Sequence, residues 1–276
     1  MTQELNDIIY NTVCEANRKL TSGEVEVSVA RELGADRRTV RRAIRDLVSQ
    51  GEFAYTYVYG TSFLEPSFDR PVRVSKRIVI KPPDRAYQSE GRDVVIDMAR
   101  GAAFGDGTHP TTCLALRALD AVFDDDGCKH PRASSSKGLD VGTGSGVLAI
   151  ALAKLGVHQV VGLDIDPCAI SEATHNVALN RLGKQVTITN SPLEELHSCF
   201  SVIVANLAFP TLRKLSPLLS SKMEQGGFLV LSGFKAPAAG NLIQAYAGQG
   251  FGVVMKEIER GWVCLTLRKT GVEPLC

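Results

Sequence analysis

The segment Gly138–Asp166 constrains the fold of this chain more than any other. Inside it a short apolar run leads into three glycines with G-x-G-x-G spacing, Gly142, Gly144 and Gly146, which are followed by apolar residues at helical spacing. A second apolar run ends at Asp164, about 20 residues after the first glycine. This order is typical of a strand, a tight glycine turn, a helix and a second parallel strand.

The same segment predicts a nucleoside cofactor. Glycines allow a ligand to lie against the backbone at a helix N-terminus, and a carboxylate at the tip of the second strand can accept both ribose hydroxyls. The glycine spacing is tighter than the G-x-G-x-x-G of dinucleotide sites, and Asp140 stands just before it. An acid followed by G-x-G-x-G resembles the S-adenosylmethionine motif of class I methyltransferases. An ordinary strand-to-helix connection is the alternative.

Composition limits the other function classes. The 276 residues suffice for two domains, and a net charge of +1 predicts no overall attraction to nucleic acid or to a membrane. No apolar run is as long as a membrane span, and the histidines lack metal-ligand spacing, so we expect neither a membrane segment nor a metal site. The seven cysteines form no C-x-x-C pair, which favours reduced thiols and a cytoplasmic protein.

Residues 1–70 resemble a winged helix-turn-helix domain. Apolar spacing predicts a helix over residues 5–20, a break at 21–24, a short helix over 29–34, and a third helix over 37–50 with Asp36 as its cap. Alternating residues from Phe53 onward then predict a β-hairpin that turns at Gly60.

Five arginines recur at three- and four-residue steps along the third helix. They lie on the side away from its apolar stripe, where helices that enter a nucleic-acid groove contact phosphates. Docking of a protein and a merely solvated helix face are the other two readings. These candidate partner-binding residues are Arg37, Arg38, Arg41, Arg42 and Arg45.

Residues 71–276 resemble the PrmA family, the methyltransferases of ribosomal protein L-eleven and their relatives. The resemblance rests on A-F-G-x-G-T-H-P-T-T at 103–112, the glycine motif, V-I-V-A-N-L-A at 202–208, G-G-F-L-V-L-S-G at 226–233 and E-R-G-W-V-C-L-T-L at 259–267. It implies an α/β fold with a doubly wound, seven-stranded sheet beside a smaller N-terminal winged-helix-like domain. The division that follows is 1–70, a linker and strand junction at 71–92, and a methyltransferase domain at 93–276.

The resemblance also implies a function and a site. We expect S-adenosylmethionine-dependent N-methylation of a lysine or N-terminal amine on a protein such as a ribosomal protein. A nucleic-acid methyltransferase guided by the winged helix, and an S-adenosylmethionine-sensing DNA-binding regulator, are the alternatives. The expected cofactor-binding residues are Thr108, Asp140, Gly142, Gly144, Gly146, Asp164, Ser191 and Asn206.

Asn206 is the candidate catalytic residue. It follows an expected strand at 201–205, and its side-chain oxygen could accept N–H bonds that aim an amine at the methyl group. A residue that only forms the turn at the strand end is the alternative. His109 is expected to bond the loop backbone or to touch the cofactor, with a catalytic base as its least favoured role.

Overall fold

The computed structural model describes residues 2–16, 18–58, 60–67, 69–99, 101, 109–124 and 135–270. They form two compact units, Met1–Pro71 and Val72–Cys276. The second unit begins within the segment expected to be a linker, and strands of that segment belong to it. The domain assignment of the sequence therefore stays a prediction in its details.

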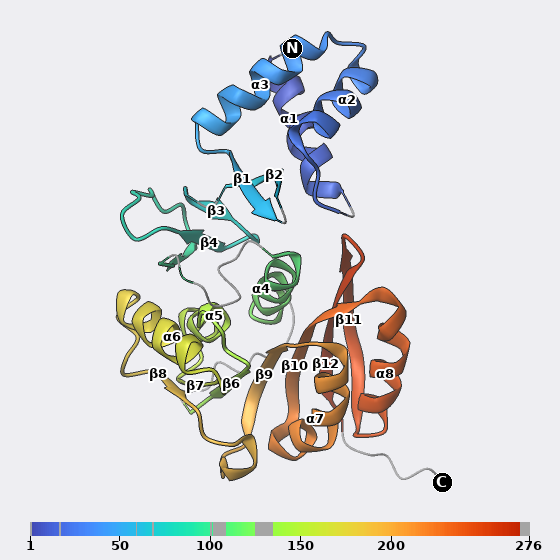
Figure 1. Ribbon diagram of the computed structural model, residues 1–276. Helices are drawn as coiled ribbons and strands as arrows, with labels where there is room; N and C mark the ends of the chain where they lie inside the picture. The colour runs from blue at the N-terminus through green and yellow to red at the C-terminus, as the bar shows by residue number, and fades with distance from the viewer. Residues whose placement is uncertain are drawn as a thin grey trace. The chain divides into compact units, whose positions relative to one another are not determined.

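The first unit contains three helices followed by a two-stranded antiparallel hairpin (Figure 1). Ile9, Ile44 and Phe53 from three of these elements meet in its small core. Its identity as a winged helix-turn-helix stays a prediction. The elements are α1 (Thr2–Glu15), α2 (Ser22–Leu33), α3 (Arg37–Ser49), β1 (Phe53–Val58) and β2 (Thr61–Pro66).

Two details of this unit differ from the sequence expectation. Helix α2 begins at Ser22, because Thr21 caps it and Glu24 bonds back to the Thr21 amide, which completes a capping box. The break expected at 21–24 is therefore the start of a helix. Asp36 stands at the N-cap of α3, but its side chain makes no capping hydrogen bond.

The second unit is built on a seven-stranded sheet with the order β11-β12-β10-β9-β6-β7-β8. β12 runs antiparallel to both of its neighbours, and the other pairs are parallel. The predicted doubly wound α/β fold with seven strands is confirmed. The strands are β6 (Lys137–Val141), β7 (Gln159–Leu163), β8 (Val186–Thr189), β9 (Phe200–Asn206), β10 (Met223–Lys235), β11 (Phe251–Glu259) and β12 (Trp262–Lys269).

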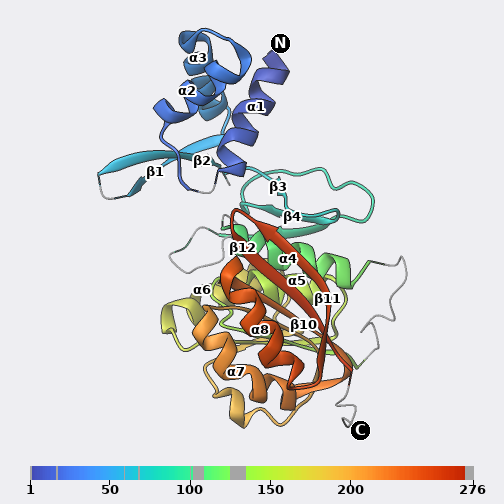
Figure 2. The ribbon, with the colours of Figure 1, turned by 90° about the vertical axis from the view of Figure 1, so that its right-hand side faces the viewer.

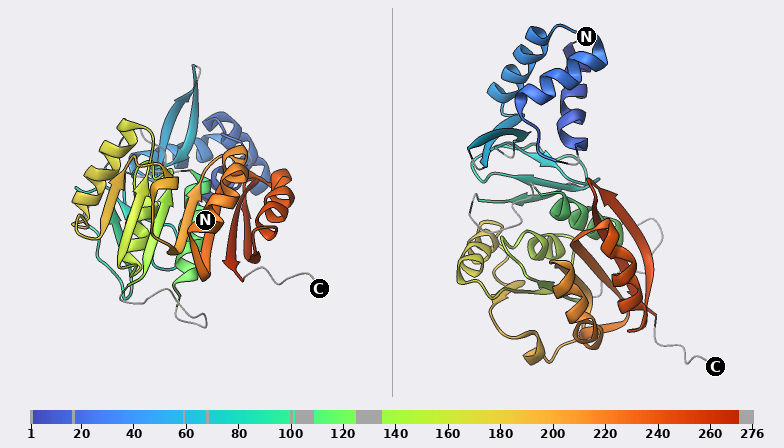
Figure 3. Two further views of the ribbon diagram at one scale, coloured as in Figure 1. Left: turned by 90° about the horizontal axis from the view of Figure 1, so that it is seen from below. Right: turned by 45° about the vertical axis from the view of Figure 1, so that its right-hand side comes forward.

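Helices cover both faces of this sheet (Figure 2 and Figure 3). Alternate residues of β9 point to opposite faces: Val202 and Val204 join the core under α4 and α5, whereas Ile203 joins the core under α7 and α8. The helices are α4 (Pro110–Val122), α5 (Val147–Lys154), α6 (Pro167–Leu179), α7 (Phe209–Lys222) and α8 (Ala239–Ala247), with 3-10 turns at Leu193–Glu195 and Ala236–Ala238.

A small sheet precedes α4 in the chain. It consists of β3 (Val72–Arg73), β4 (Ile78–Lys81) and β5 (Val94–Asp97), in that order.

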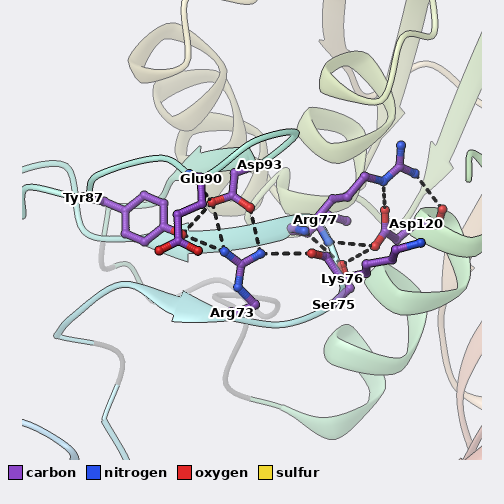
Figure 4. Close-up of polar contacts among 9 residues, drawn as sticks. Arg73, Ser75, Lys76, Arg77, Tyr87, Glu90, Asp93 and Asp120 are labelled. Carbon is purple, nitrogen blue, oxygen red and sulfur yellow. Dashed lines mark hydrogen bonds and ion pairs between the residues drawn. The ribbon is translucent and has the colours of Figure 1, made fainter.

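Buried ionic contacts fix this sheet to α4 (Figure 4). The Asp120 carboxylate accepts hydrogen bonds from the Arg77 guanidinium at 2.6 Å, the Arg77 amide at 3.1 Å and the Ser75 hydroxyl at 2.7 Å. A second, more exposed network lies within the sheet and its connections, where Asp93 accepts hydrogen bonds from both arms of Arg73 and from the Tyr87 hydroxyl. The first network holds the C-terminal half of α4, and the N-terminus of that helix reaches the candidate site.

Candidate functional site

The three motif glycines form a turn that only glycine adopts without strain. Their φ values are 74°, 53° and 86°, all in the left-handed region. The amides of Gly142 and Thr143 both donate to the Leu163 carbonyl at 2.8 Å, so the turn is fixed to the end of β7. A Cβ at Gly142 would lie 2.5 Å from Cδ2 of Leu207. The turn is therefore a close-packed glycine backbone at the carboxyl edge of the sheet, with the Leu207 side chain against Gly142.

Asp164 lies directly after β7 and contacts the glycine turn. One carboxylate oxygen accepts the Gly144 amide at 2.9 Å, and the other accepts the Asp166 amide at 3.0 Å. The side chain is half-buried and each oxygen keeps a second lone pair for a ligand. Sequence reasoning overlooked the next residue, Ile165, whose side chain is 95% exposed. Its position between Asp164 and Asp166, directly after a strand, could have indicated an exposed apolar side chain at this edge of the sheet.

Asp140 is buried beneath the turn. One of its oxygens accepts the Thr143 hydroxyl at 2.7 Å and the Ala149 amide at 3.0 Å, which ties β6 to the first turn of α5. The other oxygen has no hydrogen-bond partner among the described residues. Burial raises the pKa of the Asp140 carboxyl to about 7. Its bonds support the turn, and direct contact with a cofactor stays a prediction.

Asn206 ends β9 and joins the strand to α4. Its amide nitrogen donates to the Thr112 hydroxyl at 3.3 Å. Its side-chain oxygen is buried and has no partner within the described part of the chain. The neighbouring strand supports the same junction, because the Ser232 hydroxyl donates to the Thr111 carbonyl at 2.9 Å. A buried acceptor without a donor is costly, so this oxygen is suited to a ligand N–H.

Of the three remaining predicted residues of this unit, the structure describes Ser191 and His109. Ser191 follows β8, and its hydroxyl lies 2.9 Å from that of Thr189. His109 is the N-cap of α4, where its Nδ1 accepts the Thr111 amide at 3.3 Å. Thr108 lies outside the described residues. The site roles of Thr108 and Ser191 stay predictions.

Three of the predicted site residues lie at one edge of the sheet. β6, β7 and β9 are neighbours and run parallel, so Gly142, Asp164 and Asn206 all lie at carboxyl ends (Figure 1). This edge is where open α/β sheets bind ligands. No group of three or more potential metal ligands occurs among the described residues, and no helix there is long and apolar enough to cross a membrane.

Comparison with known proteins identifies the family. The family model described as "Ribosomal protein L11 methyltransferase (PrmA)" matches residues 66–270. The chain belongs to the PrmA family.

Curated PrmA relatives carry the name ribosomal protein L11 methyltransferase. The relative from Geobacter sulfurreducens is 38% identical over 201 residues, which cover 73% of this chain and 63% of the relative. The relative from Geobacter sp. strain M21 is 40% identical over 201 residues, covering 72% and 64% of the two chains. The chain thus spans less than two thirds of the length of these PrmA proteins.

A solved structure supports the fold. The ribosomal protein L11 methylase from Lactobacillus delbrueckii subsp. bulgaricus matches with a TM-score of 0.64 and 29% identity. The match covers 73% of this chain and 100% of that one.

The predicted arginine face lies before the stretch matched by the PrmA model. The structure divides its five members. Arg37 and Arg41 both pair with Glu26 of α2, whose side chain is 6% exposed. The Arg41 guanidinium keeps the pKa of Glu26 below its usual value. Arg38, Arg42 and Arg45 are exposed, and no ion pair joins them to other described residues.

Proposed function

We propose that this protein is an S-adenosylmethionine-dependent methyltransferase that acts on an amine nitrogen of a protein, with a ribosomal protein as the first candidate. The proposal rests above all on the buried, unpartnered side-chain oxygen of Asn206 beside the glycine turn. The names of the PrmA relatives support the choice of a ribosomal acceptor.

The residues present fit the proposed cofactor. Gly142 and Gly144 are partly exposed, so the amino-acid portion of a ligand can approach their backbone, and Asp164 retains lone pairs for ribose hydroxyls. The exposed Ile165 provides an apolar surface for the adenine ring. When bound, S-adenosylmethionine supplies a methyl group on a positively charged sulfur.

The protein then has to position a neutral amine. In the proposed mechanism the Asn206 oxygen accepts one N–H of the amine, which directs the nitrogen lone pair away from Asn206. The Thr112 hydroxyl fixes the orientation of the Asn206 amide by accepting its N–H. Holding the nucleophile in line and excluding water provides most of the rate acceleration for such a transfer.

Transfer of labelled methyl from S-adenosylmethionine into a fractionated cell lysate tests this function. We expect label in a discrete ribosomal protein, and loss of that label with Asp164→Asn. Asp166→Asn is the matched control, because it makes the same chemical change two residues further on at an exposed carboxylate that caps α6. Label confined to RNA or DNA would reject the protein acceptor.

Asn206→Ala separates an enzyme from a regulator that only senses the cofactor. We expect at least a hundredfold loss of transfer with cofactor affinity within about threefold of wild type. Asn241→Ala, at an exposed position of α8, should leave both quantities unchanged. Tight cofactor binding without transfer to any acceptor by the wild type would favour the sensor.

An acceptor on the ribosome implies a cytoplasmic protein, the compartment that the cysteines also predict.

A second function is proposed for the first unit: contact with nucleic acid through α3. Arg38, Arg42 and Arg45 follow i, i+4, i+7 spacing, so they share one face of the helix. They are the arginines of α3 that Glu26 leaves available for phosphates. This surface is compatible with a protein methyltransferase that meets its acceptor on RNA.

Glutamine at all three positions should weaken RNA binding and flatten its salt dependence by about one unit of slope per lost phosphate contact. Glutamine at Arg31, an exposed arginine near the end of α2, serves as a single-site control. Binding isotherms at several salt concentrations provide the measurement. An unchanged slope in the triple variant would assign α3 to a protein partner or to solvent.

A further inference from the structure

The end of β10, at Lys235, and the start of β12, at Trp262, lie on the side of Asn206 away from the glycine turn. We call these two residues and their strand ends the wall. The strand order places β6 and β7 on one side of β9 and β10 and β12 on the other. Asn206 pairs in register with Ser232, and Lys235 at the end of β10 pairs with Trp262 at the start of β12. If the cofactor occupies the β6–β7 side, an acceptor approaches Asn206 from this wall.

A series of side-chain contacts connects the wall to Asn206. The Lys235 ammonium lies 3.7 Å from the centroid of the Trp262 ring. The His109 ring meets the same tryptophan edge to face at a centroid distance of 5.0 Å. His109 caps α4, and Thr112 in the first turn of that helix accepts the Asn206 amide. Trp262 and Asn206 are thus held by the same helix terminus.

The chemistry of this wall favours a cation. The face of an indole ring attracts an ammonium group, and the attraction grows when the pair is shielded from water. Trp262 is half-buried, whereas Lys235 is exposed and has no ion pair among the described residues. The Trp262 ring therefore already binds one ammonium group, that of Lys235. Because the Lys235 side chain is long and exposed, its ammonium can leave the ring for solvent.

We propose that the Trp262 ring is the seat of the acceptor ammonium before transfer, and that Lys235 occupies this seat while no acceptor is bound. The acceptor is accordingly a cationic primary amine, a lysine side chain or a protein N-terminus. Lys235 acts as an internal competitor that an incoming amine displaces. The seat stands on its own geometry, and its use in methylation rests on the proposed function.

In the proposed transfer one N–H bond and the C–S bond break, and one N–C bond forms. The seated ammonium loses one proton to water as it moves toward Asn206. The nitrogen lone pair forms the new N–C bond while the C–S bond breaks, and that electron pair stays on sulfur. The positive charge passes from sulfur to nitrogen in this step, so the methylated product is already a cation and leaves without taking up a proton.

Tryptophan fluorescence tests the seat without cofactor, because Trp262 is the one tryptophan of the chain. We would titrate the protein with n-butylammonium and, separately, with 1-butanol, a neutral molecule of the same shape. A saturable change is expected with the ammonium alone. Lys235→Met removes the competitor while keeping the length of the side chain, and should tighten ammonium binding about two- to fivefold.

Lys256→Met is the matched control. Lys256 is exposed on β11, two strands away from β10, so the variant makes the same charge change elsewhere in the sheet and should bind like wild type. Equal responses to ammonium and alcohol, no saturable response, or equal affinities of wild type and Lys235→Met would each overturn the proposal.

A kinetic measurement then links the seat to transfer. With a protein acceptor that the enzyme methylates, Lys235→Met should lower KM with little change in kcat, whereas Trp262→Leu should raise KM. Failure of methylation with intact ammonium binding would reject the proposed function and keep the seat. Methylation with no KM effect in either variant would reject the seat and keep the proposed function.

Discussion

Gly142 combines two constraints that another residue cannot meet. Its φ of 74° disfavours a side chain, and Cδ2 of Leu207, the residue after Asn206, lies 2.5 Å from the position of a Cβ. Gly142→Ala should therefore displace the Leu207 side chain as well as strain the turn. We expect at least a tenfold loss of affinity for S-adenosylhomocysteine by titration calorimetry.

Gly156→Ala controls for strain alone. Gly156 has a φ of 109°, and a Cβ there would meet nothing within 4 Å. It should cost about 1 kcal/mol of stability and leave the affinity unchanged. Equal affinity losses in both variants would show that strain, rather than contact with Leu207, accounts for the effect.

The buried carboxyl of Asp140 predicts a dependence of stability on pH. Burial raises its pKa to about 7, so the folded state holds this proton more tightly than the unfolded state. The contribution of Asp140 to stability is therefore present below the unfolded pKa and is lost as pH rises toward 7. Asp140→Asn stays neutral throughout.

The stability of Asp140→Asn relative to wild type should thus increase from pH 4 to pH 7 and then level off. Urea unfolding of the two cofactor-free proteins across this range measures the difference. A constant difference would mean that Asp140 titrates alike in the folded and unfolded states.

At the scale of elements, the buried Arg77–Asp120 pair is an ionic contact between the small sheet and α4 (Figure 4). The side chains are 11% and 5% exposed. Asp120→Asn would leave a buried guanidinium without its counter-charge, so we expect a loss of about 3 kcal/mol in the free energy of unfolding. Denaturant unfolding provides the value.

Lys76→Met is the comparison for this prediction. It removes a lysine whose side chain is 67% exposed and which pairs with Asp124 of the same region. That change should cost less than about 1 kcal/mol. Similar losses in both variants would contradict the role given to the buried pair.

The elements also show what sequence reasoning could reach. Strands buried on both faces, such as β9, are continuous apolar runs that need no structure to be found. The edge strand β11 was not predicted. Val253, Val254 and Ile258 are exposed, so its apolar residues do not alternate with polar ones as in a strand with one buried face. The start of α2 was predictable from the T-x-x-E of its capping box.

The kinds of residue that form the site could be predicted from the sequence, but the contacts between them could not. The glycine spacing and Asp164 follow from sequence, because turn and strand tip are local features. The link of Asn206 to Thr112 and the stacking of Lys235 on Trp262 join residues far apart in the chain, so local patterns carry no signal for them. The pairing of Glu26 with two of the five arginines is hidden for the same reason.

For the whole molecule, two units that do not share a core predict two unfolding transitions. The first unit packs around residues such as Ile44, and the second around the large sheet. Because Trp262 belongs to the second unit, its fluorescence follows that unit alone, whereas far-ultraviolet circular dichroism follows both.

S-adenosylhomocysteine at 100 times its Kd should stabilise the fluorescence transition by about 2.7 kcal/mol. The circular dichroism transition of residues 1–71 should stay where it is. A single transition that the ligand shifts as a whole would show that the two units unfold together.

The position of β12 has a consequence for synthesis on the ribosome. This strand lies between β10 and β11 in the sheet, yet it follows both in the chain. Until it emerges from the exit tunnel, the nascent β10 presents an open row of backbone donors and acceptors, the kind of edge that invites pairing with other chains. The hairpin of β11 and β12 therefore completes the amine seat and closes this edge in one event.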